Sequence, residues 1–167
     1  MKKITFIGLG VMGFPMAGHL SKEGHNVIVY NRSEEKSKLW IENYIGTYST
    51  SIKEAVSESD IVFSCVGNDT DLREITLGTD KAFSSMKPGS VFIDHTTTSS
   101  DVAVELSEKA KDLDIHFLDA PVSGGEVGAV KGELTVMIGG ENSIFEKTKS
   151  IIAAYAKNIT LIGGSGK

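Results

Sequence analysis

Short runs of apolar residues alternate along this chain with segments in which apolar positions recur at helical spacing. The apolar runs occupy residues 4–7, 27–30, 61–66, 91–93, 115–118, 134–138 and 159–162, with a weaker one at 46–48. Helical spacing covers residues 11–23, 34–43, 51–57, 69–76, 100–113 and 142–156. Short strands that are apolar at nearly every position and are separated by helices are typical of a parallel sheet covered on both faces. The pattern therefore predicts an α/β fold with a doubly wound, mostly parallel sheet and helices on both faces.

Composition narrows the classes of partner. The chain has 167 residues and 22 acidic against 17 basic side chains, and no basic run is longer than Lys2-Lys3. Such a balance argues against nucleic acid, which proteins bind by neutralising phosphates, and favours small molecules. No apolar run approaches the ~20 residues that span a bilayer, and the chain opens directly into a strand pattern. We therefore expect no membrane partner and a cytoplasmic location.

Cysteine and histidine give no sign of a metal site or a reactive thiol. The single cysteine, Cys65, lies in the apolar run 61–66, where a buried, unreactive thiol is the ordinary interpretation. The four histidines and Cys65 are too far apart in the sequence for the spacing that metal ligands show. We expect no metal.

A glycine-rich turn follows the first apolar run directly and opens the first helical segment. It reads Gly8-Leu9-Gly10-Val11-Met12-Gly13, a G-x-G-x-x-G pattern. In this pattern Gly8 permits the tight turn, Gly10 leaves room for a pyrophosphate, and Gly13 lets the helix pack closely on the strand. The first N–H groups of the helix then face the anion. Strand, turn, helix and second strand occur in order, so the sequence predicts a Rossmann sheet in which these six residues bind a dinucleotide cofactor.

The end of the second strand bears on the choice of cofactor. An NAD site usually places Asp or Glu there to bind the adenosine ribose, but this chain has Asn31-Arg32-Ser33. Asn31 can bind the ribose without repelling a phosphate, and Arg32 can stack on adenine and pair with a 2′-phosphate. We expect NADP to be preferred and NAD to be possible. The alternative is that Arg32 is an ordinary solvated arginine before a helix capped by Ser33.

Together with the turn, three further segments resemble the β-hydroxyacid dehydrogenase family, which includes 3-hydroxyisobutyrate dehydrogenases, tartronate semialdehyde reductases and glyoxylate/succinic semialdehyde reductases. Residues 8–17 read GLGVMGFPMA, 94–99 read DHTTTS, 119–125 read DAPVSGG with Gly128-Ala129 following, and 132–140 read GELTVMIGG. The DHTTTS segment is similar to the family's D-x-[ST]-T-x-[ST] loop, and DAPVSGG to its substrate motif. The resemblance spans essentially the whole chain.

The resemblance implies roles for residues outside the glycine turn. Thr96 would lie near the nicotinamide and the substrate, while Ser123, Gly124 and Gly125 would hold the substrate carboxylate. A hydroxyl and free backbone N–H groups in a glycine turn form a small anion site, although residues 121–125 could also serve only as a turn. His95 has no fixed role in the family, so we expect it to be a local structural residue.

The resemblance also implies cofactor contacts from Val66-Gly67, at the end of the fourth strand. Many relatives have Leu-Pro at this place. The backbone of this chain is therefore expected to be less rigid there.

The family's catalytic lysine follows G-x-G-x-x-x-K, and Gly164-Ser165-Gly166 matches only the beginning of that pattern. The resemblance places the lysine beyond Lys167, so no catalytic residue is expected within this chain. It implies an NAD(P)-binding Rossmann domain over residues 1–163 and, over 164–167, the start of a linker to a C-terminal helical domain absent from this chain. The full-length protein would be a homo-oligomer.

The expected function is that of the NADP-binding half of an oxidoreductase. The full-length enzyme would interconvert a small 3-hydroxy acid and its semialdehyde, as 3-hydroxyisobutyrate dehydrogenase does, and this chain alone would be inactive. A 6-phosphogluconate dehydrogenase-like enzyme is an alternative, although residues 94–132 offer only Lys109, Lys111 and Lys131 to a phosphorylated substrate. A non-catalytic dinucleotide-binding regulatory module is a second alternative, because a fold does not determine a function.

Overall fold

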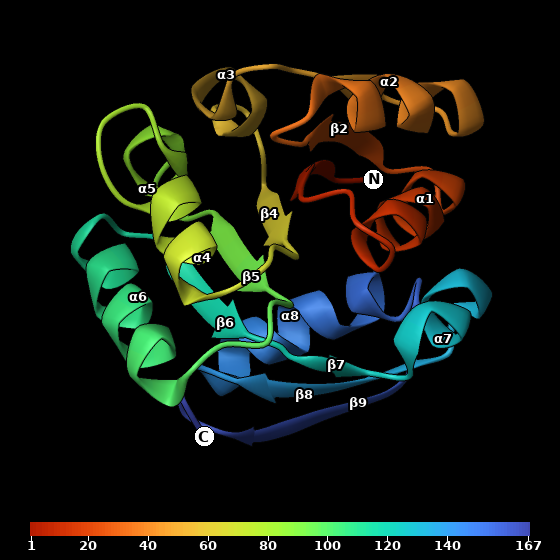
Figure 1. Ribbon diagram of the computed structural model, residues 1–167. Coiled ribbons are helices and arrows are strands. Elements are labelled where there is room, and N and C mark those ends of the chain that lie inside the picture. The colour runs from red at the N-terminus through yellow and green to blue at the C-terminus, as the bar shows by residue number, and fades with distance from the viewer.

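The strands of the computed structural model, which describes residues 1–167, join in the order β3-β2-β1-β4-β5-β6-β8-β7, with β9 paired to β8 (Figure 1). They are β1 Lys3–Ile7, β2 Asn26–Tyr30, β3 Thr47–Tyr48, β4 Ile61–Ser64, β5 Val91–Asp94, β6 His116–Asp119, β7 Val122–Ser123, β8 Leu134–Gly139 and β9 Ala156–Gly163. Strands β1 to β6 pair in parallel, whereas β8 runs antiparallel to β6 and β7 and parallel to β9. The predicted mostly parallel sheet is confirmed.

Helices cover both faces of this sheet, as predicted. They are α1 Gly13–Lys22, α2 Glu34–Asn43, α3 Ile52–Val56, α4 Asp69–Thr76, α5 Ala82–Ser85, α6 Ser100–Asp112, α7 Gly125–Lys131 and α8 Asn142–Ile152. Buried side chains of α1, α2, α7 and α8 form one apolar cluster with the sheet, and those of α3 to α6 form a second. The chain therefore has two core layers with the sheet between them.

Side chains of the buried strands alternate between the two layers, because successive residues of a strand point to opposite faces. Phe6 and Phe63 lie on neighbouring strands in the first layer, with ring centroids 5.9 Å apart. Phe92 and Phe117 stack in the second layer at 6.0 Å. Apolar residues at consecutive positions thus supply both layers at once, which explains why the strands read as continuous apolar runs.

Some element boundaries differ from the sequence predictions. The predicted helix over 142–156 ends at Ile152, and β9 begins at Ala156. Tyr155 between them is buried, and its carbonyl accepts a hydrogen bond from the N–H of Leu134. Pairing with β8 thus overrides the local helical preference. Strand β7 and helices α5 and α7 were not predicted as elements, because they are too short to show a period.

The order of the strands reverses beside β1. The chain runs from β1 outward through β2 to β3 and then returns to the other side of β1 with β4. In such a sheet the connections on the two sides diverge and leave a crevice at the carboxyl ends of the strands, which is where α/β proteins bind ligands. No helix in the structure combines the length and the apolar composition needed to cross a membrane.

Candidate cofactor-binding site

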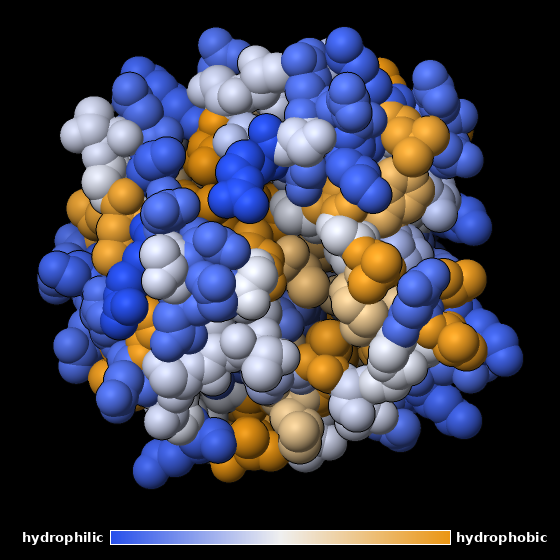
Figure 2. All heavy atoms as spheres, in the orientation of Figure 1, coloured by the Kyte–Doolittle hydropathy of each residue, from blue (hydrophilic) through white to orange (hydrophobic).

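A cleft of about 520 Å³ opens at the carboxyl ends of β1, β2 and β4, where the strand order reverses. Every predicted cofactor residue except Thr96 lines it: Gly8, Leu9, Gly10, Val11, Met12, Gly13, Asn31, Arg32, Ser33, Val66 and Gly67. In Figure 2, hydrophobic residues lie toward the middle of the face that Figure 1 presents, and hydrophilic residues dominate its rim. An apolar cleft with a few polar groups is typical of a small-molecule site.

The glycine turn is required by the fold at two of its three glycines. Gly8 has a φ of +100°, and a Cβ there would overlap the carbonyl oxygen of Cys65. A Cβ on Gly13 would overlap the carbonyl oxygen of Gly8, so the start of α1 lies directly on the turn. Gly10 differs, because a Cβ there would meet no protein atom within 4 Å. The fold itself does not need a glycine at this position, which fits a demand from a ligand.

Three backbone donors at this turn have no partner in the protein. The N–H groups of Gly10, Val11 and Met12 donate no hydrogen bond, and Phe14 N–H donates to the Gly10 carbonyl oxygen at 3.0 Å. The positive end of the α1 dipole adds to these donors, and unpaired N–H groups at a helix N-terminus are an anion site. The turn therefore fits the pyrophosphate of a dinucleotide.

Asn31 has a role in the structure that the sequence did not reveal. Its Oδ1 accepts a hydrogen bond from Leu9 N–H at 2.9 Å, and its Nδ2 donates to the Ser33 carbonyl oxygen at 3.0 Å. The amide thus holds the glycine turn against the end of β2. One hydrogen of Nδ2 and one lone pair of Oδ1 have no partner in the protein, and the expected ribose contact of Asn31 stays a prediction.

Two cations line the cleft without forming an ion pair. Arg32 is exposed and follows β2, and Ser33 next to it is the N-cap residue of α2, although its side chain makes no capping hydrogen bond. Lys81, which precedes α5, is the second cation. Neither Arg32 nor Lys81 is within 4.0 Å of a carboxylate. Anionic ligands are the natural partners of unpaired cations in a cleft.

Several residues of the cleft were missed by the sequence predictions: Ile7, Tyr30, Ile52, Cys65, Glu74, Ile75 and Lys81. Some lie next to predicted residues, but Ile52, Glu74, Ile75 and Lys81 come from α3, α4 and the loop before α5. They reach the cleft only because these elements pack together in the core layer of α3 to α6. No local motif marks them, so no signal in the sequence could have found them.

Thr96 does not line the cleft in this structure, and its expected role near the nicotinamide and the substrate stays a prediction. Its side chain is 2% exposed, and its Oγ1 accepts a hydrogen bond from Val66 N–H at 2.9 Å. Its own N–H donates to Asp94 Oδ1 at 3.0 Å. The residue faces inward because the buried carboxylate and the Val66 amide together occupy its polar atoms. In this structure Thr96 reaches the cleft only through Val66.

Asp94 and His95 are buried beside Thr96. Ser64 Oγ donates to Asp94 Oδ1 at 2.8 Å, the other carboxylate oxygen has no partner, and burial raises the pKa of Asp94 to about 6. His95 Nδ1 donates to the Ala120 carbonyl oxygen, and its Nε2 accepts from the Tyr155 hydroxyl, each at 2.6 Å. Burial lowers the pKa of His95 to about 4. His95 is therefore a neutral structural residue at neutral pH.

Cys65 lines the cleft at the end of β4. Burial and, secondarily, the charge of Asp94 raise the pKa of its thiol to about 12. A thiol at such a pKa is not a nucleophile at neutral pH. Nowhere in the chain do three or more His, Cys, Asp or Glu side chains come together as a metal ion would need.

Ser123, Gly124 and Gly125 lie outside the main cleft, exposed, where β7 leads into α7. Gly124 and Gly125 have φ values of +131° and +63°, which residues other than glycine rarely adopt. A second hollow of about 380 Å³ extends from the glycine turn to α7 and is lined on that side by Glu126 and Val130. The turn that is predicted to bind the substrate carboxylate thus lies at the start of α7, and α7 packs next to α1.

The reversed strand order, the cleft and the unpaired N–H groups of a G-x-G-x-x-G turn define a dinucleotide-binding Rossmann domain. The chain matches the family described as the NAD binding domain of 6-phosphogluconate dehydrogenase over residues 3–163, and it belongs to that family.

Several proteins are similar to this chain over nearly all of its length. An uncharacterized oxidoreductase of Shewanella frigidimarina is 51% identical over 166 residues, which are 99% of this chain and 57% of that protein. The 2-hydroxy-3-oxopropionate reductase of Escherichia coli is 35% identical over 165 residues, or 98% of this chain and 56% of that protein. The structure of Mycobacterium tuberculosis 3-hydroxyisobutyrate dehydrogenase with L-serine has a TM-score of 0.93 and 32% identity, covering 99% of this chain and 56% of that one. The chain thus spans little more than half the length of these proteins.

Proposed function

We propose that this chain is the cofactor-binding half of an NADP-preferring oxidoreductase that interconverts a small 3-hydroxy acid and its semialdehyde. The observation that carries the proposal is the cleft itself: three unpaired N–H groups at the glycine turn, with Arg32 instead of a carboxylate beyond β2. The dinucleotide supplies the hydride chemistry when bound. The residues of this chain orient it, through the turn for the pyrophosphate and Arg32 with Ser33 for a 2′-phosphate.

The proposed substrate is a small carboxylate held by Ser123, Gly124 and Gly125. All three residues are exposed, and the two glycines have positive φ values, a backbone geometry that can turn N–H groups toward an anion. The L-serine named with the Mycobacterium tuberculosis structure is itself a 3-hydroxy carboxylate. The names of that protein and of the Escherichia coli reductase support the same substrate class.

For the domains, we propose that residues 1–163 form the NAD(P)-binding unit and that 164–167 begin a linker to a helical domain that carries the catalytic lysine. The greater length of the relatives supports this division.

Calorimetric titration tests the choice of cofactor. NADPH is expected to bind more tightly than NADH, and Arg32→Ala should weaken NADPH binding about 10- to 100-fold by removing a charge-assisted pair with the 2′-phosphate. NADH binding should change little. Lys157→Ala, on the exposed edge strand β9, is the matched loss of a cation away from the cleft. Equal affinities for the two cofactors in the unaltered chain would refute the NADP preference.

Activity assays test the reaction class. A form of the protein extended to the length of its relatives would be assayed beside this chain with 3-hydroxyisobutyrate, tartronate semialdehyde, succinic semialdehyde and 6-phosphogluconate. This chain should turn over at least about 10²–10⁴-fold more slowly, since a positioned acid/base contributes that much. Turnover of 6-phosphogluconate alone would favour the decarboxylating enzyme. An extended protein that binds NADPH but reduces or oxidises nothing would favour a regulatory module.

A further inference from the structure

Two loops meet at the carboxyl ends of β4 and β5, and only the first of them lines the cleft. Residues 65–68 join β4 to α4, and residues 95–99 join β5 to α6. From the first loop, Val66 and Gly67 form one side of the cleft, which we call the Val66–Gly67 wall. Gly67 is exposed, has no side chain and donates no backbone hydrogen bond. The wall therefore has little in its own sequence to hold it in place.

The second loop, residues 95–99, provides a hydrogen bond that holds the Val66–Gly67 wall in place. Thr96 Oγ1 accepts the Val66 N–H at 2.9 Å, and Thr96 N–H donates to Asp94 Oδ1. The same carboxylate oxygen also accepts from Ser64 Oγ, in the last residue of β4. A continuous set of hydrogen bonds thus runs from the buried end of β5 to the main chain of the wall.

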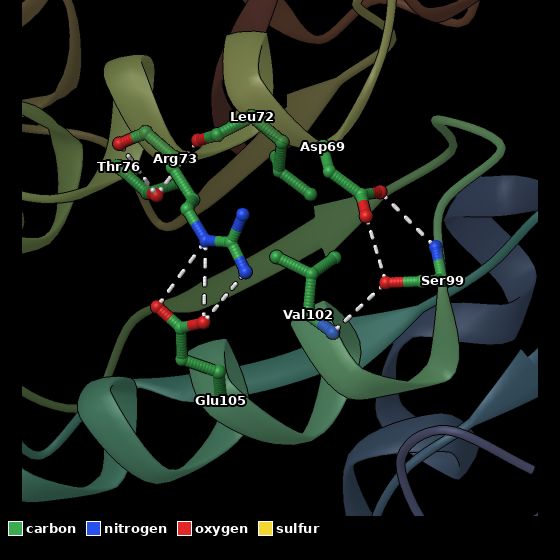
Figure 3. Close-up of polar contacts among 7 residues, drawn as sticks. All are labelled: Asp69, Leu72, Arg73, Thr76, Ser99, Val102 and Glu105. Carbon is green, nitrogen blue, oxygen red and sulfur yellow. Dashed lines mark hydrogen bonds and ion pairs between the residues drawn. The ribbon is translucent and has the colours of Figure 1, made fainter.

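A second set of contacts, made by residues that do not line the cleft, joins α4 to Ser99 and α6 (Figure 3). Asp69, at the start of α4, accepts from Ser99 N–H at 3.1 Å and from Ser99 Oγ at 2.7 Å. The Ser99 hydroxyl in turn accepts from Val102 N–H and caps α6. About one turn along, Arg73 Nη2 lies 2.9 Å from Glu105 Oε1. Figure 3 shows both contacts along the facing sides of α4 and α6, so the two helices hold the loops together from outside.

We propose that Thr96 is a positioning residue for cofactor binding, which fixes the Val66–Gly67 wall through the Val66 N–H and touches no ligand itself. The Asp69–Ser99 contact keeps the loop of Thr96 within reach. If the hydroxyl is lost, Val66 N–H loses its partner in a half-buried place, and the wall must be ordered by the ligand when it binds. The proposal rests on the proposed function in that the cleft takes a dinucleotide.

The test measures NADPH affinity and amide exchange for a set of threonine variants. Thr96→Val removes the acceptor at nearly constant volume and should weaken NADPH binding about 10-fold, whereas Thr96→Ser keeps the acceptor and should stay within about 2-fold of the unaltered chain. Thr148→Val is the matched control, because Thr148 is equally buried, at 2% exposed, and its hydroxyl bonds within α8. It should leave affinity unchanged even where it lowers stability.

Hydrogen exchange of the Val66 amide gives a readout that does not depend on ligand. This amide should be protected in the unaltered chain and in Thr96→Ser, and it should exchange faster in Thr96→Val. Normal affinity in a folded Thr96→Val, or a Val66 amide that is unprotected in the unaltered chain, would overturn the proposal. Failure of the unaltered chain to bind either cofactor would instead overturn the proposed function, which separates the two.

A surface variant keeps the proposal testable if Thr96→Val does not fold. Asp69→Ala removes the acceptor of Ser99 at an exposed contact and should weaken NADPH binding about 3-fold with faster exchange at Val66. Asp101→Ala, which removes another carboxylate from the first turn of α6 and breaks no side-chain hydrogen bond, should change neither. Equal behaviour of the two aspartate variants would count against the proposal.

Discussion

Two regions at and behind the cleft treat their polar groups in opposite ways. The region from β1 to the end of β2, residues 3–33, is contiguous in sequence and leaves its polar groups unpaired: the N–H groups of Gly10, Val11 and Met12, and the guanidinium of Arg32. The region at the ends of β4, β5 and β6 pairs most of its polar side chains inside the core, with one another or with the main chain, although one oxygen of Asp94 has no partner. The first region is prepared for a ligand, whereas the second is a scaffold that sets the shape of the site.

This difference indicates whether a substitution should change mainly the affinity for a ligand or mainly the stability of the fold. Unpaired groups that face a cleft add little to the stability of the fold and much to binding. Buried groups that satisfy one another are costly to unpair, so their loss appears first in the free energy of unfolding.

The sharpest test within the first region is Gly10→Val. Because a Cβ there meets no protein atom within 4 Å, the fold should be retained, but the branched side chain fills the space proposed for the pyrophosphate. We expect NADPH affinity to fall at least about 1,000-fold, equivalent to about 4 kcal/mol. Calorimetry and thermal unfolding measure both effects. Gly164→Val, equally open but away from the cleft, is the control, and undiminished affinity in a folded Gly10→Val would place the phosphates elsewhere.

Gly13→Ala should show the reverse pattern within the same turn. Its Cβ would overlap the Gly8 carbonyl oxygen, which is backbone and cannot rotate away, so α1 must shift. We expect the free energy of unfolding to fall by about 3 kcal/mol, at the upper end of overpacking effects. Urea unfolding gives the value. A variant as stable as the unaltered chain would contradict the close packing of α1 on the turn.

In the second region, His95 and Asp94 should give opposite pH dependences of stability. Folding lowers the pKa of His95 from 6.5 to about 4, so between these values the unfolded chain binds more protons and stability is lost as pH falls. Folding raises the pKa of Asp94 from 3.8 to about 6, so the folded chain binds more protons and stability is lost as pH rises through that range. Each shift corresponds to about 3 kcal/mol.

Variants of the two residues separate their contributions to the pH dependence of the free energy of unfolding. His95→Asn removes the first dependence, so the stability of the variant relative to the unaltered chain should rise as pH falls from about 6.5 to about 4. Asp94→Asn removes the second, and its relative stability should rise as pH increases from about 4 to about 6. Unfolding by urea at a series of pH values measures both differences. Parallel curves for all three proteins would show that neither group is held in the uncharged form by burial.

The smallest expected effect concerns Asn31, where we propose that the first region discriminates between cofactors. Asn31→Asp keeps an acceptor for Leu9 N–H and adds a charge beside the proposed 2′-phosphate. NADPH should bind about 10-fold more weakly, or about 1.4 kcal/mol, while NADH binding is kept or improved. Asn31→Ala, which removes the acceptor, should weaken both cofactors. Equal losses with Asp and Ala would mean that only the turn, and not the charge, matters at this position.

The sequence by itself determined the order of the elements and the first region of the site. Continuous apolar runs at 4–7, 27–30 and 61–66 predicted strands buried on both faces, and each run coincides with a strand of the sheet to within two residues. The glycine turn was recognisable because each of its requirements, a positive φ, close packing and space for an anion, acts on a residue within six positions of the others. Requirements that act on residues close together in the chain can be recognised as a short sequence motif.

The tertiary structure alone decided the second region. Nothing near Thr96 in the sequence shows that its hydroxyl meets the Val66 N–H, 30 positions away. His95 and Tyr155 are 60 positions apart, and Lys81 reaches the cleft from a loop without a motif. Such partners are chosen by which strands pair and how the helices pack on them, and the energies that settle this choice are spread over the whole core. A side chain's partner across the sheet therefore leaves no mark in the residues that surround it in the chain.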